Sequence, residues 1–293
     1  MYHKEKYEYK IFFNYSNIES RKVIKKMHYE YKKQKYINYE IIIIDQSEEI
    51  NYELENDRVV KYIHINKKGL SNARNIGIQY VTGDYICLID DDAIYPENYL
   101  LLIYNSLKKN QVDILCGLMK DARSGKYNIS NKDCAIQYIS FWSAMKYGIS
   151  ICCVFRTKWL ECFKFDDRFG VGRYWGAGEE TDIIWRIIEN GGVVKFDPSF
   201  FVYHDIVSKR DIKIEKLVSY NLGFGALFAK HYYEYKNISA LIYFLYSTSR
   251  NIVGLFFYLV QCDFLLAKIQ ITMMKSKFKG FMEFKKQCID NRG

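Results

Sequence analysis

Residues 85–95 read YICLIDDDAIY, a run of apolar residues that leads directly into three carboxylates, Asp90, Asp91 and Asp92. The apolar run predicts a buried β-strand. Adjacent carboxylates repel one another, so the segment is either a solvated loop or a site where a cation offsets the repulsion. Side chains alternate along an extended segment, which directs Asp90 and Asp92 to one side and Asp91 to the other. Two oxygen ligands on one side suit Mg²⁺ or Mn²⁺.

Similar apolar segments alternate with helical patterns through the first two thirds of the chain. Strands are expected at residues 10–15, 39–45, 58–65, 84–90 and 112–118, and helices near residues 19–35, 71–81 and 97–109. Continuous apolar strands joined by helices predict an α/β fold, with a mostly parallel sheet covered on both faces. Ligands of such sheets bind beyond the carboxyl ends of the strands. Asp45 ends a strand as Asp90 does, so the two acidic strand ends are expected to share one crevice.

The last third of the chain carries most of its positive charge. With 293 residues, 49% of them hydrophobic, the chain is long enough to bury a sizeable core. Residues 209–293 contain 14 lysines and arginines against 6 acidic residues, which is +8 of the total charge of +9. We therefore expect an α/β domain over residues 1–208 and a basic, aromatic-rich helical region over residues 209–293 that meets an anionic partner.

Two segments of this basic region indicate contact with a membrane surface. Residues 239–262 are long enough to span a bilayer, but Arg250 and Asn251 lie in the middle, where a charge is costly, so no transmembrane helix is expected. With the basic segment KSKFKGFMEFKK (275–286), they indicate an interfacial element drawn to anionic lipid. A helical subdomain with an exposed basic face explains the same pattern, and the two interpretations are compatible.

The cysteines and the first residues bear on the compartment. The eight cysteines show no C-x-x-C pair and no zinc-like spacing, and the charged start MYHKEKYEYK is unlike an apolar signal peptide. Reduced thiols in the cytoplasm are therefore expected. We interpret Cys152 and Cys153 as small apolar packing residues.

Acidic residues open a helix that is expected from Glu179 to Glu189. Glu179, Glu180 and Asp182 lie in its first turn, where the helix dipole favours anions, and this alone accounts for their position. The functional alternative is a carboxylate that accepts a proton from an acceptor hydroxyl.

Three further side chains have both a structural and a functional interpretation. Arg74 and Asn75 lie in the first turn of the helix near residues 71–81, where a helix N-terminus and an arginine together form an anion site. Alternatively, Arg74 is a surface residue that pairs with an acid. His204 ends an apolar, strand-like run and is either a packing residue or a metal ligand.

Taken in order along the chain, six segments resemble the family 2 glycosyltransferases of the GT-A fold. They are IIIIDQS (41–47), GLSNARNIGI (69–78), TGDYICLIDDDA (82–93), FKFDDRFGVG (163–172), GAGEETDIIWR (176–186) and VYH (202–204). The resemblance spans about residues 10–205. It implies a sugar transferase that uses a nucleotide-sugar donor, with a UDP-sugar favoured, a divalent cation (Mn²⁺ or Mg²⁺), and a single displacement that inverts the anomeric centre.

The resemblance also implies roles for single residues. Asp90 would lie near the ribose and the metal, Asp92 would ligate the ion that bridges the diphosphate, and His204 would complete the metal shell. Glu180 would occupy the position of the catalytic base, with Glu179 beside it. The nucleotide-sugar site would further include Asp45, Arg74, Asn75 and Asp91, and the acceptor side would include Trp175, Asp182 and Arg186.

Three departures from the family pattern stand out. The segment FFNYSN (12–17) lacks the proline usual near the end of the first strand. Gln46 replaces a second acid after the next strand, which affects recognition of the nucleobase. Glu180 stands where an aspartate is usual, so its carboxylate reaches one methylene further.

The resemblance further implies a setting for the protein. In similar proteins an aromatic, basic helical tail follows the catalytic domain, and the acceptor is a glycan or lipid-linked glycan at the inner face of the membrane. This implies a cytoplasmic, peripheral enzyme of capsule or O-antigen-type polysaccharide synthesis, with no nucleic-acid partner.

Three other functions compete with this one. A nucleotidyltransferase would need a glycine-rich loop after the first strand, but residues 12–20 contain no glycine. A processive polysaccharide synthase would need several clear membrane spans and a Q-x-x-R-W motif, and the sequence shows neither. The third alternative is a catalytically degenerate domain that binds a membrane or a partner, which the altered segment at Gln46 and the missing proline favour.

Overall fold

The computed structural model describes residues 11–18, 33–56, 60–90 and 92–290. The chain divides into two compact units. The first unit comprises the chain up to Phe165 together with Glu180–Ile206, and the second comprises Asp166–Glu179 together with the chain from Val207 onward. The division after Ile206 lies close to the boundary expected at residue 208. The structure adds Asp166–Glu179 to the helical unit, because the contacts of this segment are mainly with the C-terminal helices.

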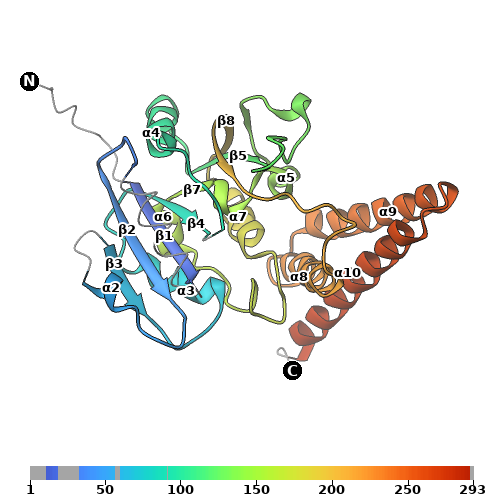
Figure 1. Ribbon diagram of the computed structural model, residues 1–293. Coiled ribbons are helices and arrows are strands. Elements are labelled where there is room, and N and C mark those ends of the chain that lie inside the picture. Colours follow the sequence, from blue (N-terminus) through green and yellow to red (C-terminus); the bar gives the residue numbers. More distant parts are fainter. Residues whose placement is uncertain (1–10, 19–32, 57–59, 91, 291–293) are drawn as a thin grey trace, which may run out of the picture. The chain divides into compact units, whose positions relative to one another are not determined.

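The first unit contains one mixed sheet with the strand order β3-β2-β1-β4-β7-β5-β8-β6 (Figure 1). The strands are β1 (Ile11–Ile18), β2 (Tyr39–Asp45), β3 (Val60–His64), β4 (Tyr85–Ile89), β5 (Ile114–Lys120), β6 (Gln137–Tyr138), β7 (Cys153–Arg156) and β8 (Val194–Tyr203). The neighbours β3, β2, β1 and β4 are parallel, as are β5 and β8, whereas β7 and β6 run antiparallel to their neighbours. The prediction of a mostly parallel sheet is thus confirmed.

Short helices connect the strands. They are α2 (Tyr52–Glu55), α3 (Leu70–Ile78), α4 (Tyr99–Lys109), α5 (Ala144–Tyr147), α6 (Thr157–Cys162) and α7 (Glu179–Glu189), with 3-10 turns at Asn131–Asp133 and Ser150–Cys152. The helices expected near residues 71–81, 97–109 and 179–189 are confirmed. The helix expected near residues 19–35 lies almost entirely outside the described residues.

The core of this unit is built on β4 and on α4. All five residues of β4 are buried, and side chains alternate along a strand, so both faces of the sheet are covered at its centre. On α4, Leu100, Ile103 and Leu107 follow a helical spacing and are buried. Burying each such side chain stabilises the fold by about 2 kcal/mol.

The register of the central strands brings two acidic strand ends to one edge of the sheet. Tyr15 on β1 pairs with Ile43 on β2 and with Ile89 on β4, so these two strands end at nearly the same level. Because β1 lies between them, their ends are about 10 Å apart. Asp45 and Asp90 therefore lie at the same edge of the sheet, and a crevice that they share stays a prediction.

The second unit contains three long helices, α8 (Ile214–Tyr233), α9 (Ile238–Val260) and α10 (Phe264–Asp290) (Figure 1). Helices α8 and α10 pack closely because glycine faces backbone: a Cβ on Gly225 would overlap the carbonyl oxygen of Lys277. Asn237 caps α9 by accepting a hydrogen bond from the Ser239 backbone at 2.7 Å. None of the helices in the described part of the chain combines the length and apolarity needed to cross a membrane.

Candidate active site

The carboxylate of Asp90 follows β4 directly and lies beside a buried arginine. Arg74 on α3 is only 1% exposed, and its Nη2 lies 3.8 Å from Asp90 Oδ1. The guanidinium also lies over the Phe165 ring, 5.4 Å from its centroid. Pairing with an acid is thus confirmed for Arg74, whereas its interpretation as a surface residue is wrong. The fixed positive charge offsets part of the carboxylate charge at the end of β4.

The next described carboxylate, that of Asp92, meets His204. The chain after β4 runs to β8, where Ile94 and Tyr203 exchange backbone hydrogen bonds of 2.9 and 3.0 Å. This antiparallel bridge sets His204 Nε2 at 3.3 Å from Asp92 Oδ2. A hydrogen bond with the Asp92 carboxylate raises the pKa of His204, although burial works against it.

The orientation of the imidazole suits a metal ligand. His204 Nδ1 lies 2.9 Å from the carbonyl oxygen of Asp205, which can only accept, so Nδ1 carries the donated hydrogen. In the neutral ring the lone pair is then on Nε2, which faces Asp92. Hydrogen bonding of one ring nitrogen commonly orients the other toward a metal in this way.

The residues present fit a divalent cation bound by a small number of protein ligands. In the part of the chain that the structure describes, no three His, Cys, Asp or Glu side chains form a metal cluster, and Asp91 lies outside the described residues. Asp92 and His204 offer one oxygen and one nitrogen, and the Asp92 side chain is 69% exposed. Mg²⁺ and Mn²⁺ at such sites keep water and bind substrate phosphates, which this open side permits.

The start of strand β7 lies near both Asp90 and Glu180. Because β7 is antiparallel to β4, with Cys87 opposite Val154, it begins at the edge where β4 ends. Burial raises the pKa of Cys152, and the negative charge of Asp90 adds to the shift. Burial likewise raises the pKa of Cys153, with a smaller contribution from Glu180. The charges of both carboxylates thus act on the start of β7. The interpretation of Cys152 and Cys153 as small packing residues is confirmed, because both are at most 1% exposed.

Glu180 is held by a helix that is packed firmly into the first unit. The indole of Trp185 on α7 stacks on Phe141 with ring centroids 4.0 Å apart, and its Nε1 donates to the Phe141 carbonyl at 2.9 Å. Glu180 is half-buried, whereas Glu179 is only 4% exposed. The helix N-terminus favours the anionic form of a carboxylate at this position. The charge of Glu180 acts on Cys153 at the start of β7.

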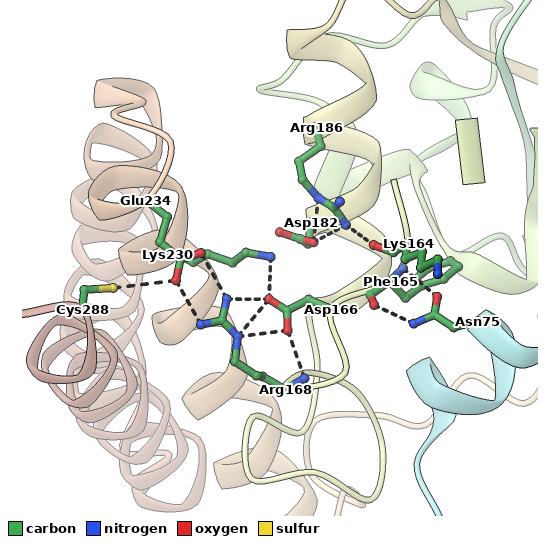
Figure 2. Close-up of polar contacts among 10 residues, drawn as sticks. All are labelled: Asn75, Lys164, Phe165, Asp166, Arg168, Asp182, Arg186, Lys230, Glu234 and Cys288. Atoms are coloured by element: carbon green, nitrogen blue, oxygen red, sulfur yellow. Dashed lines mark hydrogen bonds and ion pairs between the residues drawn. The ribbon is translucent and has the colours of Figure 1, made fainter. Parts of the chain in front are cut away.

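Asp182 and Arg186 form a buried ion pair on α7. Arg186 Nη2 lies 2.8 Å from Asp182 Oδ2 and donates a further hydrogen bond of 2.8 Å to the Lys164 carbonyl (Figure 2). Asp182 is fully buried and Arg186 is 8% exposed. These contacts give the pair a structural role, and its role on the acceptor side stays a prediction.

Removing one partner of this pair should destabilise the protein strongly. We expect Asp182→Ala to lower the free energy of unfolding by about 3–5 kcal/mol, because it leaves a buried guanidinium without its carboxylate. Chemical denaturation of the full chain measures this loss. The matched control is Lys279→Ala, which removes an i,i+4 pair whose side chains are 61% and 38% exposed and should cost less than about 1 kcal/mol. Equal losses in the two variants would contradict the structural role.

The end of β2 carries a satisfied carboxylate next to an unsatisfied amide. Asp45 Oδ1 accepts from the Ser47 backbone at 2.8 Å, and Oδ2 accepts from the Tyr62 hydroxyl at 2.6 Å. Gln46 is 3% exposed, and neither its amide nitrogen nor its amide oxygen has a hydrogen-bond partner among the described residues. A buried amide left this way costs about 1–3 kcal/mol, which makes Gln46 a candidate for hydrogen bonds to a ligand.

Two other predicted site residues have structural contacts. The amide of Asn75 holds the backbone of Phe165, donating to its oxygen and accepting from its nitrogen, both at 2.8 Å (Figure 2). Trp175, in the second unit, is 2% exposed and packs against Phe284 with centroids 5.9 Å apart. Nucleotide binding by Asn75 and acceptor binding by Trp175 stay predictions.

A charge network around the buried side chain of Lys230 belongs to the second unit (Figure 2). Lys230 on α8 is 2% exposed, and its ammonium lies 2.8 Å from Asp166 Oδ2. Arg168 bonds the same carboxylate and also both oxygens of Glu234. Burial raises the pKa of Asp166, but hydrogen bonding to Arg168 and the charge of Lys230 hold it below its ordinary value. The network ties Asp166–Glu179 to α8, which explains why this segment joins the helical unit.

Comparison with known proteins agrees with this geometry. A family model described as glycosyl transferase family 2 matches residues 11–165, more than half of the chain. The glycosyltransferase GlyG of Streptococcus pneumoniae is 32% identical over 92 residues, which cover 29% of this chain and 31% of GlyG. WfgD of Escherichia coli, named as a UDP-Glc:alpha-D-GlcNAc-diphosphoundecaprenol beta-1,3-glucosyltransferase, is 28% identical over 90 residues, which cover 29% of this chain and 36% of WfgD. The matched segment thus spans well under half of these relatives.

A solved structure extends the likeness to nearly the whole chain. The crystal structure of S. aureus TarS 1–349 in complex with UDP superposes with a TM-score of 0.57 at 13% identity, covering 96% of this chain and 92% of that one. At this identity the likeness shows the fold alone. The family match and the fold confirm the resemblance found in the sequence: the chain belongs to glycosyl transferase family 2 and has the GT-A fold.

Proposed function

We propose that the protein is a metal-dependent, inverting glycosyltransferase that moves a sugar from a nucleoside-diphosphate sugar to a hydroxyl of a glycan or lipid-linked glycan. The observation that carries this proposal is the pairing of Asp92 with His204 beside Asp90 and Arg74. Two strand ends and one helix thereby gather two carboxylates, an imidazole and a guanidinium at one edge of the sheet.

The donor fits the charges at this edge. Asp92, Asp90 and His204 would hold a divalent cation against the diphosphate, and the cation would offset the negative charge that develops on the leaving group. Arg74 adds a fixed positive charge behind Asp90. The solved TarS complex with UDP and the UDP-Glc in the name of WfgD support a UDP-sugar.

The base of the nucleotide is assigned to the end of β2. Asp45 would accept a hydrogen bond from the nucleobase, and Gln46 would satisfy its buried amide with the same ligand. Asn75 and Asp91 are proposed to complete the nucleotide-sugar site, as the family resemblance implies.

Glu180 is proposed as the catalytic base. Its carboxylate accepts the proton of the acceptor hydroxyl while that oxygen forms a bond to the anomeric carbon. The bond from this carbon to the diphosphate oxygen breaks in the same step, so the configuration inverts and no covalent glycosyl-enzyme forms. Trp175, Asp182 and Arg186 are proposed to border the acceptor.

The setting is proposed to be the inner face of a bacterial membrane, in surface-polysaccharide synthesis. The net charge of +8 over residues 209–293 and the lipid-linked acceptor in the name of WfgD support a peripheral enzyme at an anionic surface. A catalytically degenerate binding module remains the competing function, and Gln46 and the missing proline favour it. The contact between Asp92 and His204 supports the catalytic function instead.

A donor screen separates these two functions. We expect UDP with Mn²⁺ to raise the melting temperature of the full chain by about 5 °C or more at a hundredfold excess over its dissociation constant, and to raise it little with EDTA. The same mixtures, supplied with UDP-sugars, should show Mn²⁺-dependent release of UDP. If no nucleotide stabilises the protein and no donor is turned over, the transferase proposal is wrong and the binding module is favoured.

A further inference from the structure

A cavity of about 700 Å³ opens in the second unit, and none of the residues that line it is among those assigned to catalysis. Most of the residues that line it belong to α9 and α10. A short turn joins these two helices (Figure 1). Aromatic side chains of α9, such as Tyr246 and Phe257, line it together with three cationic residues: Lys209, Arg250 and Lys277. Among the described residues, no carboxylate lines the cavity.

The most unusual of these side chains is that of Lys277, which is buried. It is 5% exposed, and its ammonium donates to Asn251 Oδ1 at 2.9 Å and to the Ser247 carbonyl at 3.3 Å. An ammonium has three hydrogens to donate, so one is left for a ligand. Burial lowers the pKa of Lys277 to about 8, and the charges of Arg250 and Lys209 act in the same direction.

The cluster of Lys277, Arg250 and Lys209 destabilises the fold unless an anion offsets its positive charge. Taking an ammonium out of water costs several kcal/mol, and here the nearby charges repel it further. A purely structural role needs no charge at position 277, because a neutral polar side chain would also form a hydrogen bond with Asn251. The Asn251 amide is already held in place, since it donates to Gln270 Oε1 at 2.8 Å. The charge, the free donor and the open volume together point to a bound anion.

The cavity continues into an exposed apolar surface at the α9–α10 turn. Val253 and Phe257 line the cavity and are also 68% and 56% exposed. Further along the turn lie other exposed apolar side chains: Phe256, Val260, Phe264 and Leu265. Contiguous exposed apolar side chains mark an interaction surface. Cations next to such a surface fit an amphiphile with an anionic head and an apolar chain.

We propose that this cavity binds the phosphate group of a lipid, with Lys277, Arg250 and Lys209 around the phosphate and the lipid chain along the apolar side chains of the α9–α10 turn. The inference deepens the proposed peripheral membrane association and is independent of the transfer chemistry. It assigns the contact with the lipid to one cavity rather than to the overall positive charge of residues 209–293.

The test uses a soluble, short-chain lipid phosphate, dihexanoylphosphatidic acid, below its micelle concentration. Titration calorimetry with the full chain is run in EDTA and without nucleotide, so a failure here leaves the transferase proposal untouched. We expect saturable binding of one molecule, and at least about tenfold weaker binding to Lys277→Met and to Arg250→Gln. The matched control is Lys275→Met, because Lys275 lies on the same helix, is exposed and does not line the cavity. It should change the affinity less than about twofold.

Two variants and a second ligand keep the proposal falsifiable. Arg250 is exposed, so Arg250→Gln tests the site even if Lys277→Met fails to fold. If Lys275→Met weakened lipid-phosphate binding as much as the cavity variants do, the attraction would come from the general positive charge, and the assigned site would be overturned. Inorganic phosphate that binds as tightly as the lipid phosphate would overturn the lipid as ligand, and absence of binding by either would overturn the site itself.

Discussion

Replacing Asp92 with asparagine should lower the rate of sugar transfer by at least about a hundredfold at saturating donor and Mn²⁺. The substitution keeps the size of the side chain but removes the negative charge of the group that faces His204 Nε2 and that is proposed to bind the cation. The cation would then bind weakly, and the charge on the departing diphosphate would be left without its main counter-charge. Steady-state turnover over a range of Mn²⁺ concentrations measures the loss, which excess Mn²⁺ should restore only in part.

A neighbouring aspartate supplies the control for this variant. Asp205→Asn makes the same change of charge one residue from His204, but the Asp205 side chain faces Arg123, with the two groups 2.9 Å apart. The backbone oxygen of Asp205 contacts the imidazole, and the substitution keeps this oxygen. We expect a loss smaller than about threefold. If Asp92→Asn turned over substrate as fast as Asp205→Asn, Asp92 would not be a metal ligand.

Replacing Glu180 with glutamine should abolish transfer by a different route. The amide cannot accept the proton of the acceptor hydroxyl, so we expect the turnover number to fall about 10²–10⁴-fold. The affinity for UDP with Mn²⁺ should stay within about twofold, because the residues assigned to the nucleotide and the cation are unchanged. Calorimetry with UDP and turnover with a UDP-sugar measure the two quantities on the same preparation.

The adjacent glutamate makes this prediction specific. Glu179→Gln is the same chemical change one position away, on a side chain that is only 4% exposed. We expect its loss of turnover to be at least about tenfold smaller than that of Glu180→Gln. The reverse ranking would move the catalytic base to Glu179, and parallel losses of UDP affinity would show that Glu180 acts through binding.

Periodic patterns in the sequence predict the parallel half of the sheet well. The strands expected at residues 39–45 and 84–90 match β2 and β4 closely, because both are continuous apolar runs that are buried along most of their length. The segment CVFR of β7 is too short to show a period, and its place between β4 and β5 depends on pairing with residues about forty and seventy positions away. No local pattern carries that information.

The candidate site likewise contains some contacts that local sequence patterns predict and others that depend on long-range pairing. The strand ends indicate Asp45 and Asp90 as neighbours at one edge, because the register of parallel strands follows from their apolar runs. The contact between Asp92 and His204 depends on the bridge between Ile94 and Tyr203, which no periodicity predicts, and only the family resemblance suggested it. The buried state of Asp182 was not predicted at all, since acidic residues at helix starts are usually solvated.

The most direct measurement is the position of Mn²⁺ in crystals of the full chain soaked with MnCl₂ and UDP, located by anomalous scattering. We predict one strong manganese peak within coordination distance of an Asp92 carboxylate oxygen and of a UDP phosphate oxygen, with the His204 ring turned toward it. A UDP molecule bound without manganese at this edge of the sheet, or manganese bound only elsewhere, would contradict the proposed metal-dependent transfer.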